Sequence, residues 1–288
     1  MLRGLYTAAS GMVAQQRIHD TVTNNIANIN TPGYKQENAV NRSFPEMLLS
    51  MTGLNDEPVT KVGKVNTGVF AEEAPFLQLQ GDLAETSRPL DFALVSDLIV
   101  PGVTFDASGK AVSEDGEVTY QPQAYFTVQN ANGETRYTRD GSFSLDPAGY
   151  LVTSNGDRVL GTNGQPIVFP AGIAEEQLEL TADNRFIDSR TNADTGMQLL
   201  ITRVNNPNDL VREGDGLYMY NGEEDGIGPL GAGENAAVRQ GYIERSNVDA
   251  AQAAVSLMSA LRAYEANQKV VQFYDASLDK AVNSVGRV

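Results

Sequence analysis

The chain of 288 residues contains no cysteine, so disulfide bonds, thiolate chemistry and cysteine metal sites are all excluded. It contains a single histidine, His19, which is too few for a catalytic triad or an imidazole-rich metal site. We therefore expect no catalytic residue, no metal site and no cofactor. The composition predicts a protein that acts through its surfaces.

Long apolar runs are also missing. No uncharged apolar stretch approaches the roughly 18 residues of a membrane-spanning helix. The N-terminus lacks the apolar core of a secretory signal, because Gln15, Gln16 and Arg17 fall where that core would continue. We expect no direct membrane insertion, and an export route without a cleaved signal if the protein leaves the cell.

Basic residues are scarce in the middle of the chain. The net charge is −16, and residues 48–241 carry 12 basic and 29 acidic side chains, whereas 1–47 and 242–288 are nearly balanced. The acidic excess argues against nucleic acid and anionic membranes as partners. The near-neutral ends can pack against copies of themselves.

The C-terminal region has neither glycine nor proline between residues 242 and 285, although the chain has 27 glycines and 12 prolines. Ser246 with Asp249 three residues later is typical of a helix start, and Gly286 of a helix stop. Apolar residues alternate at three- and four-residue spacing, which predicts a long helix with a heptad seam. The predicted seam is Ala254, Leu257, Leu261, Tyr264, Gln268, Val271, Asp275, Leu278, Val282 and Val285.

The N-terminal region repeats this pattern. A helix is predicted from Leu2 to Ile29, ended by Pro32 and Gly33, although Gly4 and Gly11 each destabilise it by roughly 1 kcal/mol relative to alanine. Its predicted seam is Leu5, Ala8, Met12, Gln15, His19, Val22, Ile26 and Ile29. Polar seam residues, here Gln15, His19, Gln268 and Asp275, can set the register between helices.

The middle of the chain reads as β-structure. Turn dipeptides such as Asn132-Gly133, Asp140-Gly141 and Asn155-Gly156 recur about every eight residues between short β-branched or aromatic segments. They predict an antiparallel meander from residue 124 to 160, with further strands at 197–204 and 217–220. Residues 35–75 are predicted to be extended, with one short helix near 45–51.

The predicted fold class is therefore α+β, with paired, coiled-coil-like N- and C-terminal helices and an antiparallel β-rich middle domain. The expected organisation is an N-terminal assembly helix (1–34), an extended connector (35–76), a β-rich outer domain (77–241) and a C-terminal assembly helix (242–288). Residues 97–121 are expected to form an inserted loop or hairpin within the β-rich domain.

Seven blocks of this sequence resemble the bacterial flagellar basal-body rod and hook proteins, most closely the rod members. They are LYTAASGM at 5–12, TNNIANINTPGYK at 23–35, PLDFAL at 89–94, YTRDGSF at 137–143, GYLV at 149–152, GYIERSNV at 241–248 and RAYEAN at 262–267. The blocks follow the family order along nearly the whole chain. One departure is the stretch 97–121, which stands where the family usually continues directly into a Gly-x-Gly-Phe-Phe strand.

The resemblance implies a structural, non-enzymatic subunit of the flagellar basal-body rod, exported by the flagellar type III apparatus. Its partners would be copies of itself and neighbouring rod and hook proteins, assembled through the terminal helices into a tubular axle. The residues expected at subunit interfaces are Leu5, Met12, Val22, Asn24, Asn25, Ile26, Asn28, Ile29, Leu257, Leu261, Tyr264, Asn267, Val271, Leu278 and Val282.

Two alternatives remain open at this point. One is another axial protein, of the hook or hook cap. The other belongs to a different class, a secreted β-rich protein that binds or hydrolyses glycans through acidic pairs. The low aromatic content of 7% argues against the second.

Overall fold

The computed structural model describes all residues except 1, 52–59, 73–75, 99, 107–108, 114–115, 171–172, 232–233, 235 and 286–288. The fold is α+β, as predicted, with an N-terminal helix, a C-terminal helix and an antiparallel β-rich body. The chain divides into two compact units. The helical unit comprises residues 1–27, 37–75 and 249–288, and the β-rich unit comprises 28–36 and 76–248.

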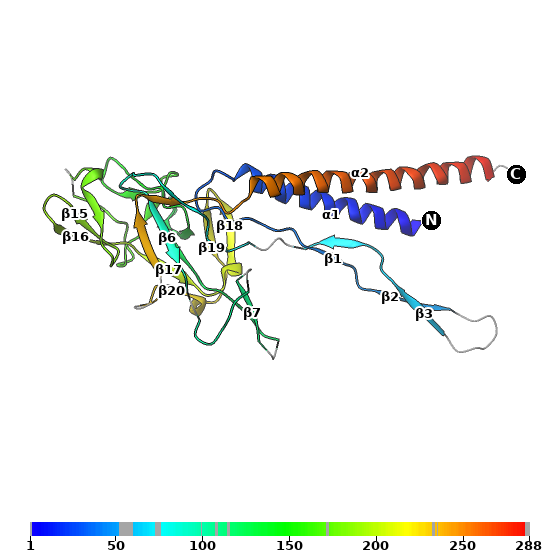
Figure 1. Ribbon diagram of the computed structural model, residues 1–288, viewed down its shortest axis with the longest axis horizontal. Coiled ribbons are helices and arrows are strands. Elements are labelled where there is room, and N and C mark those ends of the chain that lie inside the picture. The colour runs from blue at the N-terminus through cyan, green and yellow to red at the C-terminus, as the bar shows by residue number, and fades with distance from the viewer. Residues whose placement is uncertain are drawn as a thin grey trace. The chain divides into compact units, whose positions relative to one another are not determined.

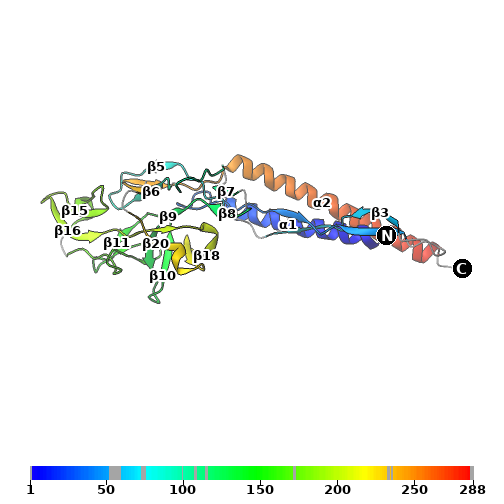
Figure 2. The ribbon, with the colours of Figure 1, turned by 90° about the horizontal axis from the view of Figure 1, so that it is seen from below.

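In the helical unit, α1 (Leu2–Ala27) and α2 (Ala250–Lys280) lie side by side in both views (Figures 1 and 2). They are antiparallel, because Gly4 of α1 faces Tyr274 whereas Gly11 faces Asn267. A Cβ atom on Gly4 would overlap the Tyr274 ring. The two glycines that weaken α1 in isolation are therefore positions where α2 approaches closely. A short π-helical segment, η4 (Ala281–Val285), follows α2.

The start of α2 differs from the prediction. The N-cap is Asp249, whose Oδ1 accepts hydrogen bonds from the amides of Ala251 and Gln252 at 2.8 and 3.0 Å. Ser246 lies before the helix, and residues 242–244 are a strand instead of helix. A capping carboxylate satisfies two amide donors at once, and this outweighs the Ser246 signal. The helix has 31 residues and is about 46 Å long.

At every second position of the predicted seam, the residue of α2 that is covered is the one immediately before the predicted residue. Leu257, Tyr264, Val271 and Leu278 are partly covered, as the spacing indicated, but Leu261 is exposed and Ala260 is buried in its place. The covered residues at three- and four-residue spacing are Ala253, Leu257, Ala260, Tyr264, Asn267, Val271, Tyr274 and Leu278 of α2 and Ala281 of η4. The pattern favoured large apolar residues, whereas the buried side chains of α2 are the small Ala253 and Ala260.

The predicted connector contains strands, and the short helix expected near 45–51 is wrong. In its place β2 (Met47–Met51) pairs with β3 (Thr60–Val65), and β1 (Asn41–Ser43) pairs with β4 (Val69–Ala71). Ser10 and Thr7 of α1 bond the backbone beside β4, at Val69 and Thr67. This segment is therefore an integral part of the helical unit.

The β-rich unit contains the meander predicted between residues 124 and 160. β9 (Gln123–Gln129) is the central strand of a sheet of nine described strands. It pairs with β10 (Thr135–Thr138), β13 (Arg158–Val159) and β17 (Ile201–Val204). The single strand predicted at 197–204 is two strands, β16 (Ala193–Gln198) and β17. β16 belongs to a three-stranded sheet with β14 (Leu178–Leu180) and β15 (Arg185–Asp188), whereas β17 belongs to the large sheet.

The strands of this unit are β5 (Leu83–Glu85), β6 (Phe92–Ser96), β7 (Lys110–Val112), β8 (Val118–Tyr120), β9 (Gln123–Gln129), β10 (Thr135–Thr138), β11 (Ser144–Leu145), β12 (Leu151–Val152), β13 (Arg158–Val159), β14 (Leu178–Leu180), β15 (Arg185–Asp188), β16 (Ala193–Gln198), β17 (Ile201–Val204), β18 (Leu210–Gly214), β19 (Leu217–Tyr220), β20 (Ile227–Pro229), β21 (Ala236–Gln240) and β22 (Tyr242–Glu244).

An aromatic cluster fills the core of the β-rich unit. Phe126 meets Phe143 edge-on with ring centroids 5.3 Å apart, and Phe169 meets Phe186 in the same way at 5.1 Å. Phe92 joins both pairs. Edge-on rings of this kind stabilise a core beyond the burial of their area, so this unit has a complete interior of its own.

Within the stretch 97–121, β7 and β8 form a hairpin, in line with the prediction of a loop or hairpin. Val112 and Val118, partners across the two strands, are both exposed. In the part of the chain that the structure describes, neither helix is apolar enough over its length to cross a membrane.

Candidate assembly surface and buried charge network

A face of α2 carries large apolar side chains that are exposed in the part of the chain that the structure describes. Phe273 is 71% exposed, and Val255 and Met258 are more than half exposed. Val255 and Phe273 are 18 residues apart, which is five helical turns, so they lie on one face. That face is opposite Ala253 and Ala260, which are buried. On α1, Tyr6 and Val13 are similarly exposed and lie seven residues apart. Apolar helix faces of this kind are typical of protein–protein contacts.

Apart from three asparagines, the predicted interface residues divide into two groups. Those that are partly covered within the chain are Leu5, Met12, Val22, Ile26, Ile29, Leu257, Tyr264, Asn267, Val271 and Leu278. Those that remain open are Leu261, 43% exposed, and Val282. The sequence reading did not select Tyr6, Val13, Val255, Met258 or Phe273, because a single heptad seam does not distinguish the two faces of a helix with apolar residues on both.

The three asparagines near the end of α1 have different environments. Asn25 is buried; its Nδ2 donates to the Glu37 carbonyl at 2.8 Å, and its Oδ1 accepts from the Glu37 amide at 3.0 Å. The expectation that Asn25 contacts a neighbouring subunit is therefore corrected: its amide holds the chain's own backbone. Asn28 accepts from the Thr31 hydroxyl in the turn after the helix, and Asn24 is exposed.

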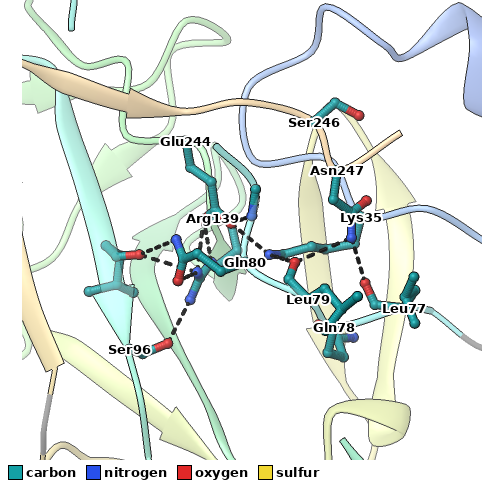
Figure 3. A network of polar contacts seen from close by, with 12 residues as sticks. Lys35, Leu77, Gln78, Leu79, Gln80, Ser96, Arg139, Glu244, Ser246 and Asn247 are labelled. Atoms are coloured by element: carbon teal, nitrogen blue, oxygen red, sulfur yellow. Dashed lines mark hydrogen bonds and ion pairs between the residues drawn. The ribbon is translucent and has the colours of Figure 1, made fainter. Parts of the chain in front are cut away.

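In the β-rich unit, three of the sequence blocks meet in a network of buried charges (Figure 3). Lys35 ends the block at 23–35, Arg139 follows β10, and Glu244 is the last residue of β22. Each of the three is only 1% exposed. A charge removed from water is tolerated only when it is paired and hydrogen-bonded, so these contacts decide whether the segments fold together.

Glu244 is at the centre of the network. Its Oε1 accepts from Lys35 Nζ at 2.6 Å and from the Gly81 amide at 2.9 Å, and its Oε2 accepts from Arg139 Nε at 2.9 Å. Burial would raise the pKa of Glu244, but the charges of Arg139 and Lys35 hold this pKa below its usual range. The carboxylate is therefore ionised and satisfied on both oxygens.

Arg139 extends the network into the sheet. Its Nη1 donates to the carbonyl of Ala124 at 2.7 Å, and its Nη2 donates to the carbonyl of Leu94 at 3.2 Å and to Gln80 Oε1 at 3.3 Å. The planar fork of a guanidinium suits such divergent acceptors. Arg139 thus joins β6 and β9 to Glu244.

Lys35 completes the network from the N-terminal side. Its Nζ donates to the Leu79 carbonyl at 2.7 Å as well as to Glu244. Burial and the neighbouring Arg139 charge lower the pKa of Lys35 to about 8, and Glu244 offsets this only in part. The site holds two cations against one anion.

Two further residues anchor the same segments. Asn247 donates from Nδ2 to the Leu77 carbonyl at 2.8 Å and accepts the Gln36 amide on Oδ1 at 2.7 Å. The sequence reading gave Lys35, Arg139, Glu244 and Asn247 no role. The available signal was the presence of charged or amide side chains in blocks otherwise made of apolar and turn residues.

Next to the network, the Arg212 side chain contacts aromatic rings. The Arg212 guanidinium lies 4.4 Å from the Tyr34 ring centroid and 4.7 Å from that of Phe76, and its Nη2 donates to the Lys35 carbonyl at 3.0 Å. Cation–π contacts with these two rings stabilise a partly desolvated guanidinium. Among the described residues, no three or more His, Asp or Glu side chains form a group that could hold a metal ion. The arrangement is suited to holding segments in place.

Comparison with known proteins finds family matches in the three regions of the chain that supply Lys35, Arg139 and Glu244. Residues 5–35 match the family model of the flagella basal body rod protein, 121–184 the flagellar hook protein FlgE/F/G D1 domain, and 239–284 the flagellar basal body rod FlgEFG protein C-terminal region. The buried network draws on the first and third of these matches and on residues of the second.

The similarity to relatives extends over the full length of the chain. The flagellar hook-basal body complex protein FlhO of Bacillus subtilis (strain 168) is 37% identical, with 100% of both chains covered. The flagellar basal-body rod protein FlgG of Borreliella burgdorferi is 30% identical over 98% of each chain. FlgG of Bacillus subtilis is 29% identical over 98% of this chain and 99% of the relative.

These relatives set aside the alternative of a secreted glycan-binding or hydrolytic protein. The chain belongs to the flagellar basal-body rod and hook protein family, and it is a structural, non-enzymatic protein of the flagellar basal body.

Proposed function

We propose that the protein is a subunit of the flagellar rod and assembles through its terminal helices into the tubular axle that links motor to hook. The uncovered apolar face of α2 carries this proposal. Its side chains Val255, Met258 and Phe273 are exposed in the single chain. Burying a side chain of this size contributes on the order of 1.5–3 kcal/mol, so a few such contacts favour association with a neighbouring copy.

Within one subunit, we propose that α1 and α2 pair as an antiparallel coiled coil. Leu257, Tyr264, Val271 and Leu278 supply the seven-residue repeat on α2, and Gly4 and Gly11 let the helices approach closely. Neighbouring copies would then pack on the opposite faces. Leu261 of α2 and Val282 of η4 are exposed in the single chain, and we expect subunit contacts at these positions.

The proposed partners are copies of this chain, neighbouring rod and hook proteins, and the flagellar type III export apparatus. The relatives carry rod or hook-basal body names, which supports the first two. Gly4 and Gly11 support the third, because α1 is marginally stable until α2 covers it and can be threaded in an unfolded state.

Deletion and restoration of the gene test this function. In the source bacterium, deletion should abolish swimming and leave envelopes without hooks and filaments in electron micrographs, and restoration should rescue both. A restored gene with Phe273→Asp should fail to rescue. Val112→Asp, on the exposed hairpin of the β-rich unit, is the matched control and should rescue. Normal swimming after deletion would contradict the rod assignment.

The hook is the second candidate, because the match at 121–184 is to a domain that hook and rod proteins share. The same micrographs separate the two. A rod subunit should leave rods missing or truncated, whereas a hook subunit should leave complete rods that lack hooks.

A further inference from the structure

Two segments far apart in the sequence are docked on each other in the β-rich unit. Residues 33–36 follow the turn after α1, and residues 244–247 precede the N-cap of α2. The Gly33 amide donates to the Glu244 carbonyl at 2.8 Å, and the Gln36 amide donates to Asn247 Oδ1 at 2.7 Å. The ion pair between Lys35 and Glu244 stands between these two bonds.

A third segment, residues 77–81, is hydrogen-bonded to residues 33–36 and to residues 244–247. Lys35 Nζ donates to the Leu79 carbonyl, and the Leu77 amide donates to the Gln36 carbonyl at 2.8 Å. From the other side, the Gly81 amide donates to Glu244 Oε1. Neither terminal segment could be withdrawn without leaving polar groups of this shared segment unpaired.

The backbones approach so closely where the segments dock that two positions require glycine. Gly33 has a φ of 67°, and a Cβ atom there would lie 2.6 Å from the Arg139 carbonyl carbon. A Cβ atom on Gly81 would overlap the Arg245 carbonyl oxygen. Both glycines therefore let the backbone approach closely enough to exclude water from the ion pairs.

We propose that Lys35, Glu244 and Arg139 form a clasp that makes the docking of residues 33–36 and of residues 244–247 conditional on each other. If residues 33–36 leave, Glu244 keeps Arg139 but loses Lys35, and the Leu79 carbonyl keeps only the longer bond from Asn247 Nδ2, at 3.2 Å. If residues 244–247 leave, two cations remain buried without an anion. Each segment therefore supplies the charge or the hydrogen bond that the other needs.

The consequence concerns the two stretches of chain that continue into the terminal helices. Residue 28 follows the last residue of α1 directly, and residue 248 precedes Asp249, the N-cap of α2. The clasp makes these stretches fold as one cooperative element. This inference is independent of the proposed polymerisation, because it concerns a single chain.

Hydrogen exchange of the full-length chain tests the clasp with Lys35→Met, which keeps the length of the side chain but removes its charge and donors. We expect the amides of Gly81 and Arg245, which donate to Glu244 Oε1 and to the Asp82 carbonyl, to exchange at least about tenfold faster. The Val128 amide in the centre of the sheet is the reference and should keep its rate.

Arg136→Met is the matched control, because Arg136 pairs with Glu213 in the same unit outside the clasp. It should leave Gly81 and Arg245 unchanged. The inference is overturned if Lys35→Met speeds exchange only within residues 33–36. It is also overturned if Val128 rises in step with Gly81, because Lys35 would then support the whole unit without coupling the two segments.

Glu244→Gln tests the reverse direction. We expect the Gly33 and Gln36 amides, which belong to the N-terminal segment, to exchange faster than in the wild-type chain. Unchanged rates at these two amides would overturn the coupling. Since Glu244→Gln can destabilise the whole unit, the Lys35→Met comparison with Val128 decides the result in that case.

Discussion

The two units of this protein treat polar and apolar side chains in opposite ways. In the β-rich unit, large aromatic residues such as Phe92 and Phe126 are fully buried, and charged residues are buried with them. In the helical unit, the buried side chains among the described residues are Ala8, Ala14, Ala253, Ala260 and Asn25, while its largest apolar residues are exposed. One unit completes its own interior, and the other leaves large apolar side chains such as Phe273 exposed.

This difference explains why the charge of the chain is so uneven. The acidic excess lies within residues 48–241, most of which belong to the closed unit. The helices are nearly neutral, so their association is not opposed by like charge.

The largest effect is expected from Glu244→Ala. Removing the carboxylate leaves Lys35 and Arg139 buried without an anion, so the β-rich unit should lose about 3–5 kcal/mol of unfolding free energy. Denaturant unfolding followed by the fluorescence of its tyrosines measures this. Glu134→Ala, which removes an exposed partner of Arg136, is the control and should leave the unfolding free energy nearly unchanged. Equal losses would mean that the buried network contributes no more than a surface ion pair.

Acidification should give a smaller loss in the same unit. The pKa of Glu244 is lower in the folded than in the unfolded chain, so its contribution is complete above the usual value of 4.5 and disappears as the pH falls through the folded pKa. The unfolding free energy should therefore fall more steeply below about pH 4.5 in the wild-type chain than in Glu244→Gln, which cannot titrate there. Parallel curves would show that another carboxyl group controls acid unfolding.

In the helical unit, Gly4→Ala and Gly11→Ala should differ. A Cβ atom on Gly4 would overlap the Tyr274 ring, so overpacking should destabilise the helix pair by about 1–3 kcal/mol. At Gly11 the Cβ atom would lie 2.9 Å from the mobile amide of Asn267, and alanine adds helix propensity of roughly 1 kcal/mol, so the change should be near neutral. Thermal melting followed by far-ultraviolet circular dichroism compares them. Equal melting temperatures would contradict the close approach at Gly4.

The same positions show how far the sequence could predict the structure. The α+β class, the N-terminal helix to within two residues of its end and most hairpin strands followed from local signals: heptad spacing, Pro32-Gly33 and the Asn-Gly turns. These signals depend on neighbours in the sequence. The strands β1 to β4 were missed, because their pairing and their bonds to α1 depend on residues distant in the sequence.

The candidate site was predicted less completely for a related reason. Spacing identified Leu257, Tyr264, Val271 and Leu278, but it could not reveal that Ala260 is buried in place of Leu261, because that burial depends on a helix distant in the sequence. The clasp was missed because Lys35 and Glu244 are 209 residues apart, and no periodicity links them.

Leu261→Asp should have the smallest effect on folding and yet prevent assembly. Leu261 is 43% exposed in the single chain, so the substitution should change unfolding free energy by no more than about 0.5 kcal/mol. In a subunit contact the same carboxylate would be buried without a partner, which strongly disfavours association. Leu257→Asp is the matched control: it lies four residues earlier on the partly covered face, so it should lower the melting temperature of the isolated chain. Swimming and envelope micrographs of a strain carrying Leu261→Asp give the readout. If this strain swims normally while Leu257→Asp unfolds, the open flank of α2 is not a subunit contact, and assembly must use the face of Val255 and Phe273 alone.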